Sequence, residues 1–466
     1  MFNPNIGVPV GILQGRPLFC DYTHALTIAP AGSGKGVSGS IPELVHGYGY
    51  VDKQGCYQTT SVIATDFKSE LSETTSRCRR ELHQQEVLYL NPDDVGGLGS
   101  VRFNPLQFVL DDAKSRKTRK YCKSSAEGIV AILIPEPKEG DKNSFFRNGS
   151  RNMLVTCTLW LALHKPEECT LPELFRIVSS AERLKAFLET AKNSTNLKGD
   201  IALLASGLLS TEEDHFADFL TGAFQAVSSF SPGGPLADIV SQSDFSFEDL
   251  KWKGMTVYFI VPYHRLDVYK VWLALVTKAA LFSLALSGGN IPVTFVLDEA
   301  TNFALPGLAN DLTALRGVGG RVRMFIQAYS ELERVFGKEA AKTISSQCNV
   351  KQYYRVSSLE EAKTISEMIG EYTFKTASLG ADRTSPWSDL KDSVSEAGRL
   401  VMRPEEILSM PSTDQILHIS GYPPIYCQRL PYNQVSPWYD WVDPNPVEGG
   451  KLPADIQVEM QFRRCA

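Results

Sequence analysis

The sequence predicts an α/β fold built on a mainly parallel sheet, with an all-helical domain inserted into it. Short, almost continuously apolar runs alternate with helix-like patterns near both ends of the chain. This alternation is typical of a parallel sheet that is covered on both faces. Between about residues 107 and 240 the strand-like runs stop, and apolar residues recur at intervals of three and four instead.

Six apolar runs are the expected strands: residues 25–30, 61–66, 86–90, 255–262, 292–298 and 322–327. Helical patterns follow several of them, at 36–46, 69–82 and 267–286. Because these runs lie on both sides of the helical region, the two outer pieces of the chain must form one sheet domain. The predicted division is therefore 1–106 and 241–466 for the sheet domain and 107–240 for the insertion.

The insertion is expected to hold long helical segments at 144–164, 171–191 and 197–230. The dipeptide Asn104-Pro105 and the Ser-Pro-Gly-Gly turn at 231–234 mark its borders. A polar stretch at 375–398 has no sustained periodicity and predicts a long loop. The proline-rich tail after Pro431, which carries Trp438 and Trp441, is expected to pack along the surface.

Composition limits the classes of protein to which the chain can belong. It has 466 residues, 43% of them hydrophobic and 21% charged, which describes an ordinary folded protein. The formal net charge of −6 predicts no broad basic surface for nucleic acid. Nine cysteines without a C-x-x-C pair indicate free thiols in a reducing cytosol. The longest apolar stretch, 271–286, is interrupted by Lys278 and is too short to span a bilayer, so we expect a soluble chain.

Residues 29–38, APAGSGKGVS, place glycines and a lysine between an expected strand and an expected helix. Phosphate-binding loops have glycine, four residues, glycine-lysine and then serine or threonine, and their N–H groups converge on an anion. Ala29 stands in place of the first glycine, and Gly36 in place of the hydroxyl that binds Mg²⁺. A glycine turn that binds nothing is therefore the alternative. The candidate nucleotide-binding residues are Ala31, Gly32, Ser33, Gly34, Lys35, Gly36 and Val37.

The segment PVTFVLDEA at 292–300 supplies the acidic partner that such a loop needs. Its apolar run delivers Asp298 to the end of a strand, which we expect beside the loop strand, with Glu299 next. Asp298 is the predicted Mg²⁺ ligand, Glu299 the base for the attacking water, and Lys35 the bridge between the β- and γ-phosphates of ATP. An isolated Asp-Glu pair is more often a solvated loop, but the ordered pairing with the glycine turn favours nucleotide binding.

Two further positions fit a ring-forming ATPase. Gln327 ends the run VRMFIQ, where its amide can sense the γ-phosphate, or it is simply a polar strand end. Arg316 lies at an expected helix end before glycines and can reach a neighbouring subunit's nucleotide as an arginine finger. A solvated surface arginine is the alternative for Arg316.

Several stretches, in order along nearly the whole chain, resemble the type IV coupling proteins, the ATPases that bring substrates to conjugation and type IV secretion machines. The matching segments are HALTIAPAGSGKGVSGSIPELV, SVIATDFKSELSETTSRCRR, VRFNPL, TVYFIVP, VTFVLDEATNFALPGL, RMFIQAYSELERVFG, EAKTISEMIGEYT, RLVMRPEEILSMP and ISGYPPIYCQRLPY. The resemblance implies a RecA-like P-loop NTPase core with an inserted all-α domain, which binds ATP and Mg²⁺. It also implies a homohexameric ring around a channel for DNA. Members of this family often carry glycine after the P-loop lysine.

The resemblance further implies partners: secretion-system components, substrate adaptors, and a DNA or effector protein substrate. It places the chain in the cytoplasm at the inner membrane, attached through an anchor that was removed or that a separate subunit supplies. Two other functions stay open. One is a scaffold that retains the fold without hydrolysis, which Gly36 favours, and the other is a related DNA-pumping motor or helicase.

Overall fold

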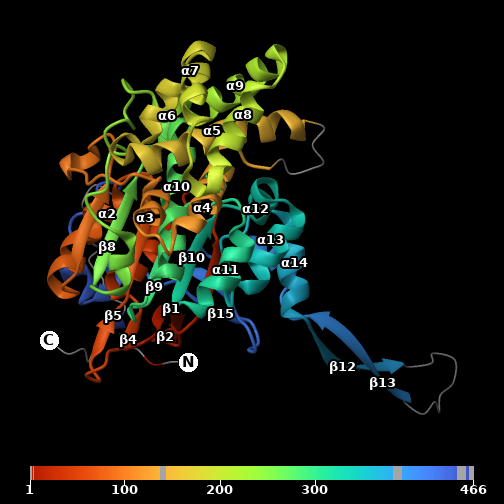
Figure 1. Cartoon of the computed structure of the whole chain (residues 1–466). Helices are drawn as coiled ribbons and strands as arrows, with labels where there is room; N and C mark the ends of the chain where they lie inside the picture. The colour runs from red at the N-terminus through yellow and green to blue at the C-terminus, as the bar shows by residue number, and fades with distance from the viewer. Residues whose placement is uncertain (1–2, 4, 137–142, 381–390, 449–457, 461–466) are drawn as a thin grey trace.

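The computed structural model of the chain describes residues 3, 5–136, 143–380, 391–448 and 458–460. Its main feature is a sheet of eleven strands in the order β2-β1-β15-β14-β11-β3-β10-β9-β6-β8-β7 (Figure 1). The six expected strands are all present: β3 (His24–Ile28), β6 (Ser61–Asp66), β7 (Glu86–Leu90), β8 (Met255–Ile260), β9 (Val293–Leu297) and β10 (Gly320–Ile326). They pair in parallel, which confirms the predicted fold class.

Five strands that the sequence did not predict extend this sheet on the β3 side. β11 (Val350–Tyr354) is parallel to β3. Beyond it, β14 (Asp414–Ile419), β15 (Ile425–Gln428), β1 (Val8–Leu13) and β2 (Arg16–Cys20) pair antiparallel. Two short strand pairs lie apart from the sheet: β4 (Gly49–Val51) with β5 (Tyr57–Thr59), which is antiparallel, and β16 (Val435–Ser436) with β17 (Val458–Glu459), which is parallel.

One topological expectation was wrong. β9, the strand that ends before Asp298, does not lie beside the loop strand β3, because β10 is inserted between them. Ile326 of β10 pairs with Ile28 of β3, and Met324 of β10 pairs with Leu297 of β9. The three parallel strands end at the same edge, so the segments that follow them still meet there.

Successive side chains of a strand point to opposite faces of the sheet, and both faces are buried, which explains the nearly continuous apolar sequences of the strands. In β10, Val322, Met324 and Ile326 pack on one face, in the same cluster as residues of α10 (Leu266–Leu286) and α11 (Leu308–Gly317). Phe325 packs on the opposite face with residues of α1 (Ile41–His46) and α2 (Glu70–Arg77). Both faces of the parallel sheet are therefore covered by helices.

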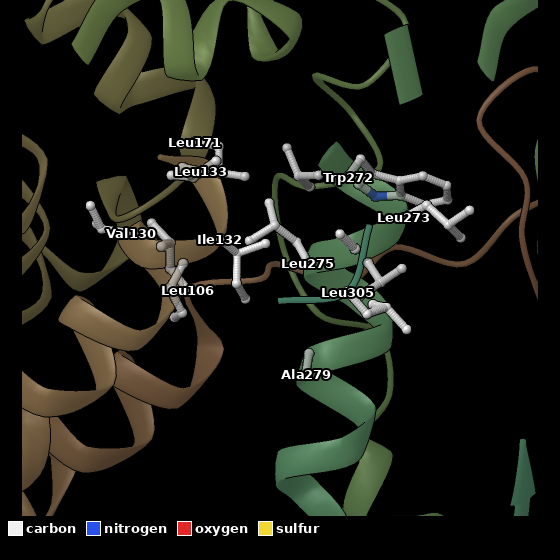
Figure 2. Packing of buried hydrophobic residues seen from close by; sticks show 14 of the residues in the cluster. Leu106, Val130, Ile132, Leu133, Leu171, Trp272, Leu273, Leu275, Ala279 and Leu305 are labelled. Atoms are coloured by element: carbon white, nitrogen blue, oxygen red, sulfur yellow. The ribbon is translucent and has the colours of Figure 1, made fainter. Parts of the chain in front are cut away.

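α10 is the central core helix on its face of the sheet. By length and composition alone the helical stretch 263–286 could cross a membrane, but 72% of its most apolar window is buried inside the protein. Figure 2 shows Ile132 and Leu133 of α4 (Cys122–Leu133) facing Leu275 of α10. Trp272 is fully buried in the same cluster. Packing within the chain therefore accounts for the apolar character of α10.

The region 107–230 contains helices only among its described residues. These are α3 (Gln107–Lys114), α4, α5 (Ser144–His164), α6 (Leu171–Ile177), α7 (Ala181–Ala191), α8 (Asp200–Leu209) and α9 (Glu213–Val227), of which α5 to α9 gather at the top of Figure 1. The expected segment 171–191 is two helices, because Ser180 has an extended backbone and its hydroxyl accepts a hydrogen bond from the Arg183 N–H. One apolar cluster runs from this region through α10, so the boundaries at 107 and 240 stay a prediction.

One further expectation about the second half was wrong. The stretch 375–398, expected as a loop, includes parts of β12 (Glu371–Gly380) and β13 (Lys391–Leu400), antiparallel strands that project from the body in Figure 1; residues 381–390 lie outside the described residues. The tail after Pro431 lies against the body of the protein: Trp438 is fully buried against α1 and the sheet, while Asp440 and Val447 are exposed. The remaining helices are α12 (Tyr329–Phe336), α13 (Lys338–Gln347), α14 (Leu359–Ile369), α15 (Pro404–Leu408) and α16 (Trp438–Trp441).

Candidate nucleotide-binding site

The glycine turn leaves the carboxyl end of β3 and leads into a π-helical turn, Gly36–Ser40, and then α1. The Ala29 N–H donates to the Ile326 carbonyl at 2.9 Å, so Ala29 continues the parallel ladder and needs no glycine conformation. Gly32 and Gly34 have φ angles of 69° and 80°, in the left-handed region that favours glycine. The turn therefore keeps glycine at two positions where the backbone requires it.

Lys35 and Glu299 meet at this edge of the sheet. The Lys35 Nζ lies 3.4 Å from the Glu299 Oε1, and the two side chains are only 10% and 11% exposed. Glu299 has a φ of 47°, an uncommon conformation for a residue with a side chain. The Ala300 N–H donates to the Phe325 carbonyl at 3.0 Å, and the Asn302 amide donates to the second carboxylate oxygen of Glu299. A strained backbone thus holds the Glu299 carboxylate against the lysine of the loop.

Asp298 lies beside this pair and has an unsatisfied oxygen. Its Oδ1 is buried and finds no hydrogen-bond partner within the described part of the chain. Burial raises the pKa of Asp298 to about 7; Lys35 acts against this shift, while Glu299, Asp66 and Glu70 add to it. A buried carboxylate oxygen without a partner is costly, and it fits a ligand for a hard divalent cation. Among the described residues, no three acidic, histidine or cysteine side chains form a metal site by themselves.

Asp66, at the end of β6, repeats the pattern of an apolar strand followed by aspartate, yet its environment is different. It accepts hydrogen bonds from the Ser72 N–H and hydroxyl, both at 2.8 Å, and from the Lys68 N–H at 3.2 Å. Burial raises the pKa of Asp66, and the bonds from Ser72 oppose that shift. Asp66 therefore holds the start of α2, whereas one oxygen of Asp298 has no partner in the part of the chain that the structure describes.

The other two predicted catalytic residues lie at opposite edges of the sheet. Gln327 directly follows β10, between the glycine turn and Asp298, and is half-buried. Arg316 is exposed in the last turn of α11, near the start of β10. Its charge contributes to a lowered pKa of His24, the first residue of β3, which places it at the amino ends of the strands. Arg316 therefore does not join the other predicted residues within this chain.

Sequence reasoning missed a cation that touches the glycine turn. The Arg429 guanidinium donates to the Ser33 carbonyl and lies 5.2 Å from the centroid of the Tyr354 ring. Burial lowers the pKa of Arg429. Arg429 directly follows β15, and only the antiparallel strands on that side of the sheet bring it to the turn. No local pattern around residue 429 signals this contact.

Comparison with known families gives a match over most of the chain. The model of a family described as Type IV secretory system Conjugative DNA transfer matches residues 7–447. The protein VirD4 of Rhizobium radiobacter is 28% identical over 430 residues, covering 88% of this chain and 57% of the relative. The conjugal transfer protein TraG of Escherichia coli is 24% identical over 449 residues, covering 88% of this chain and 67% of the relative. The chain thus spans somewhat more than half the length of the VirD4 relatives, 57% and 59% for two of them.

Solved structures share the fold. The unbound bacterial conjugative coupling protein TrwBdeltaN70 aligns with a TM-score of 0.65 at 17% identity, covering 91% of this chain and 88% of that one. The plasmid coupling protein TrwB in complex with ADP and Mg²⁺ aligns with a TM-score of 0.64 at 17% identity, covering 91% and 89%. At this level of identity the likeness establishes the architecture, which is that of a RecA-like P-loop core.

Proposed function

The chain belongs to the Type IV secretory system conjugative DNA transfer family, and we propose that it is an ATP-hydrolysing coupling protein that delivers DNA or protein substrates to a secretion channel. The observation that carries the proposal is the 3.4 Å contact between Lys35 of the glycine turn and Glu299 after β9. Two partly buried charges from distant segments satisfy each other at the edge of the sheet where ligands of α/β proteins bind.

The Lys35–Glu299 ion pair suggests how the chain's own groups work on ATP. The N–H groups of the turn and Lys35 bind the phosphates, which replace Glu299 as the partner of the lysine. Glu299, released from the ion pair, orients the attacking water and accepts its proton. Gln327, between the two halves of the site, senses the terminal phosphate. Asp298 is the residue that would hold Mg²⁺, which when bound neutralises charge on the phosphate oxygens.

The position of Arg316 supports a ring. An exposed arginine at the opposite edge of the sheet cannot reach the nucleotide of its own chain, so it acts in our proposal on the nucleotide of a neighbouring copy. We propose a homohexamer that works at the cytoplasmic face of the inner membrane with secretion-system components and substrate adaptors. TrwB, which shares the fold, has been solved with ADP and Mg²⁺, and we extend nucleotide and Mg²⁺ binding to this chain.

The test is hydrolysis by a Glu299→Gln variant, because the amide keeps the shape of the side chain and loses the base. We expect ATP turnover to fall by about 10²- to 10⁴-fold, while ATP binding is retained. Glu339→Gln, on the exposed surface of α13, is the matched control and should hydrolyse ATP like the wild type. If Glu299→Gln hydrolyses ATP at the rate of the wild type, the role assigned to Glu299 is wrong.

A second candidate function is a scaffold that binds nucleotide without hydrolysing it. The specific observation in its favour is Gly36, which leaves the loop without its usual hydroxyl. A wild-type chain that binds ATP and shows no turnover, with or without single-stranded DNA, would favour the scaffold. Turnover that single-stranded DNA stimulates would favour a motor acting on nucleic acid, and stimulation by a protein substrate alone would favour effector delivery.

A further inference from the structure

A carboxylate occupies the space in which the missing hydroxyl of the loop would stand. A Cβ atom built on Gly36 would lie 2.8 Å from the Glu70 Oε1 and 3.1 Å from its Oε2. Real Cβ atoms do not come within 3.0 Å of other atoms, so a serine or threonine at position 36 would require the end of the Glu70 side chain to shift. The glycine at position 36 therefore leaves room for the Glu70 carboxylate in its present position.

The orientation of Glu70 is fixed by the C-terminal tail. The Asn445 side-chain amide donates to the Glu70 Oε1 at 2.9 Å. Asn445 is itself buried, and its Oδ1 accepts from the N–H groups of Val447 at 2.9 Å and Glu448 at 3.3 Å. Because the amide oxygen of Asn445 is committed to the backbone, its nitrogen must face Glu70. Glu70 is thus held beside the loop by a buried neighbour.

The Glu70 carboxylate lies near those of Asp298 and Asp66. The charge of Glu70 is among the causes that raise the pKa of both Asp298 and Asp66, so its carboxylate lies close enough to act on each. Asp298 keeps a buried oxygen without a partner in the described part of the chain, while Lys35 is paired with Glu299. A second carboxylate near nucleotide phosphates repels them unless a cation lies between.

We propose that the Glu70 carboxylate takes the place of the absent hydroxyl at position 36 and binds, together with Asp298, the Mg²⁺ that accompanies the nucleotide. This inference rests on the proposed function, since the phosphates complete the metal site. Mg²⁺ is commonly held by one or two carboxylates plus phosphate oxygens and water. The Ser33 hydroxyl is less suitable, because it already donates to the Pro30 carbonyl at 2.5 Å. Asn445 is a positioning residue for Glu70.

The experiment measures ADP affinity by calorimetry in Mg²⁺ and in EDTA, for the wild type and Glu70→Gln. The ratio of the two affinities, the Mg²⁺ enhancement, should fall by about 10- to 100-fold in the variant. In EDTA the variant should bind ADP at least as tightly as the wild type, because the substitution removes a negative charge beside the phosphates. Glu73→Gln, in the first turn of the same helix, is the matched control and should keep the wild-type enhancement.

A double variant keeps the inference testable if Glu70→Gln folds poorly. Gly36→Ser combined with Glu70→Ala returns the hydroxyl while removing the carboxylate beside it, and should recover most of the Mg²⁺ enhancement. Binding of Mn²⁺ with ADP, followed by electron paramagnetic resonance, should change in parallel. If Glu70→Gln keeps the full enhancement, Glu70 is only a support for α2 and the inference is wrong. If the wild type binds no ADP under either condition, the proposed function itself fails.

Discussion

The two edges of the parallel sheet, at the amino and the carboxyl ends of its strands, differ in how well their buried charged side chains are hydrogen-bonded. At the amino ends of β6, β7 and β8, the fully buried Arg79 donates to the Thr256 hydroxyl at 2.9 Å, to the carbonyls of Leu44 at 3.1 Å and Thr60 at 2.9 Å, and to the Gln85 side chain at 2.6 Å. At the carboxyl ends, Asp298 has an oxygen without a partner among the described residues, and Glu299 has a left-handed backbone. The amino edge is built for stability, whereas the carboxyl edge keeps costly groups that a ligand can satisfy.

The largest expected effect is at the amino edge. Arg79→Met should reduce the free energy of unfolding by about 3–5 kcal/mol, because it leaves several buried oxygen atoms without a donor, at about 1–3 kcal/mol each. Arg80→Met is the matched control, since Arg80 is the next residue and is exposed, and it should cost less than about 1 kcal/mol. Urea unfolding of both variants at pH 7.5 measures the difference. An Arg79→Met chain as stable as the control would show that the amino edge is not the stabilising one.

His24 makes the amino edge sensitive to acid. Its Nε2 lies 2.9 Å from the Leu312 carbonyl. Burial lowers the pKa of His24 to about 4; the hydrogen bond to Leu312 opposes this shift, and the charges of Arg316 and Arg321 add to it. The unfolded chain binds a proton at His24 more readily than the folded chain does. The contribution of His24 to the free energy of unfolding is therefore fully present above about pH 6.5 and is lost as the pH falls toward 4, by up to about 3 kcal/mol.

His24→Gln should lack this part of the pH dependence, because an amide does not titrate in that range. His215→Gln, whose side chain is 41% exposed on α9, is the control and should keep the wild-type slope. Unfolding free energies measured from pH 4 to 7 decide the matter, and equal slopes for the His24 variant and the wild type would rule His24 out.

The carboxyl edge predicts the reverse result, a substitution that stabilises. Since burial raises the pKa of Asp298 to about 7, its contribution to stability is present at low pH and is lost as the pH rises through 7. Without nucleotide and metal, Asp298→Asn should therefore be more stable than the wild type at pH 8, by about 2 kcal/mol, and the gain should shrink at pH 5. Thermal unfolding in EDTA at the two pH values provides the comparison. A variant that is less stable than the wild type at pH 8 would mean that Asp298 is satisfied in the free protein.

The sequence predicted the part of this molecule that depends on local pattern. The six core strands, the glycine turn and the acidic strand tip are short segments whose residues carry their own signal. What it missed depends on segments far apart in the chain: β10 between β3 and β9, Arg429 on the glycine turn, and Trp438 buried against α1. Glu70 lies within one of the segments that carry the family resemblance, but its position beside Gly36 depends on tertiary packing and has no local sequence signal.

The smallest expected effect comes from replacing glycines that have a left-handed backbone. Comparing one glycine in the loop with one outside it distinguishes the cost of backbone strain from a role in ligand binding. Gly32, in the loop, and Gly15, between β1 and β2, have φ angles of 69° and 76°, and a Cβ on either would touch nothing within 4 Å. Alanine at each position should therefore cost a similar free energy of unfolding, about 1 kcal/mol, from the left-handed backbone alone. Only Gly32→Ala should also weaken ADP binding, because its Cβ enters the space in which the loop N–H groups approach a phosphate. Equal ADP affinities in the two variants would mean that the phosphates do not lie against Gly32, and the ligand-binding part of the carboxyl edge would have to be placed elsewhere.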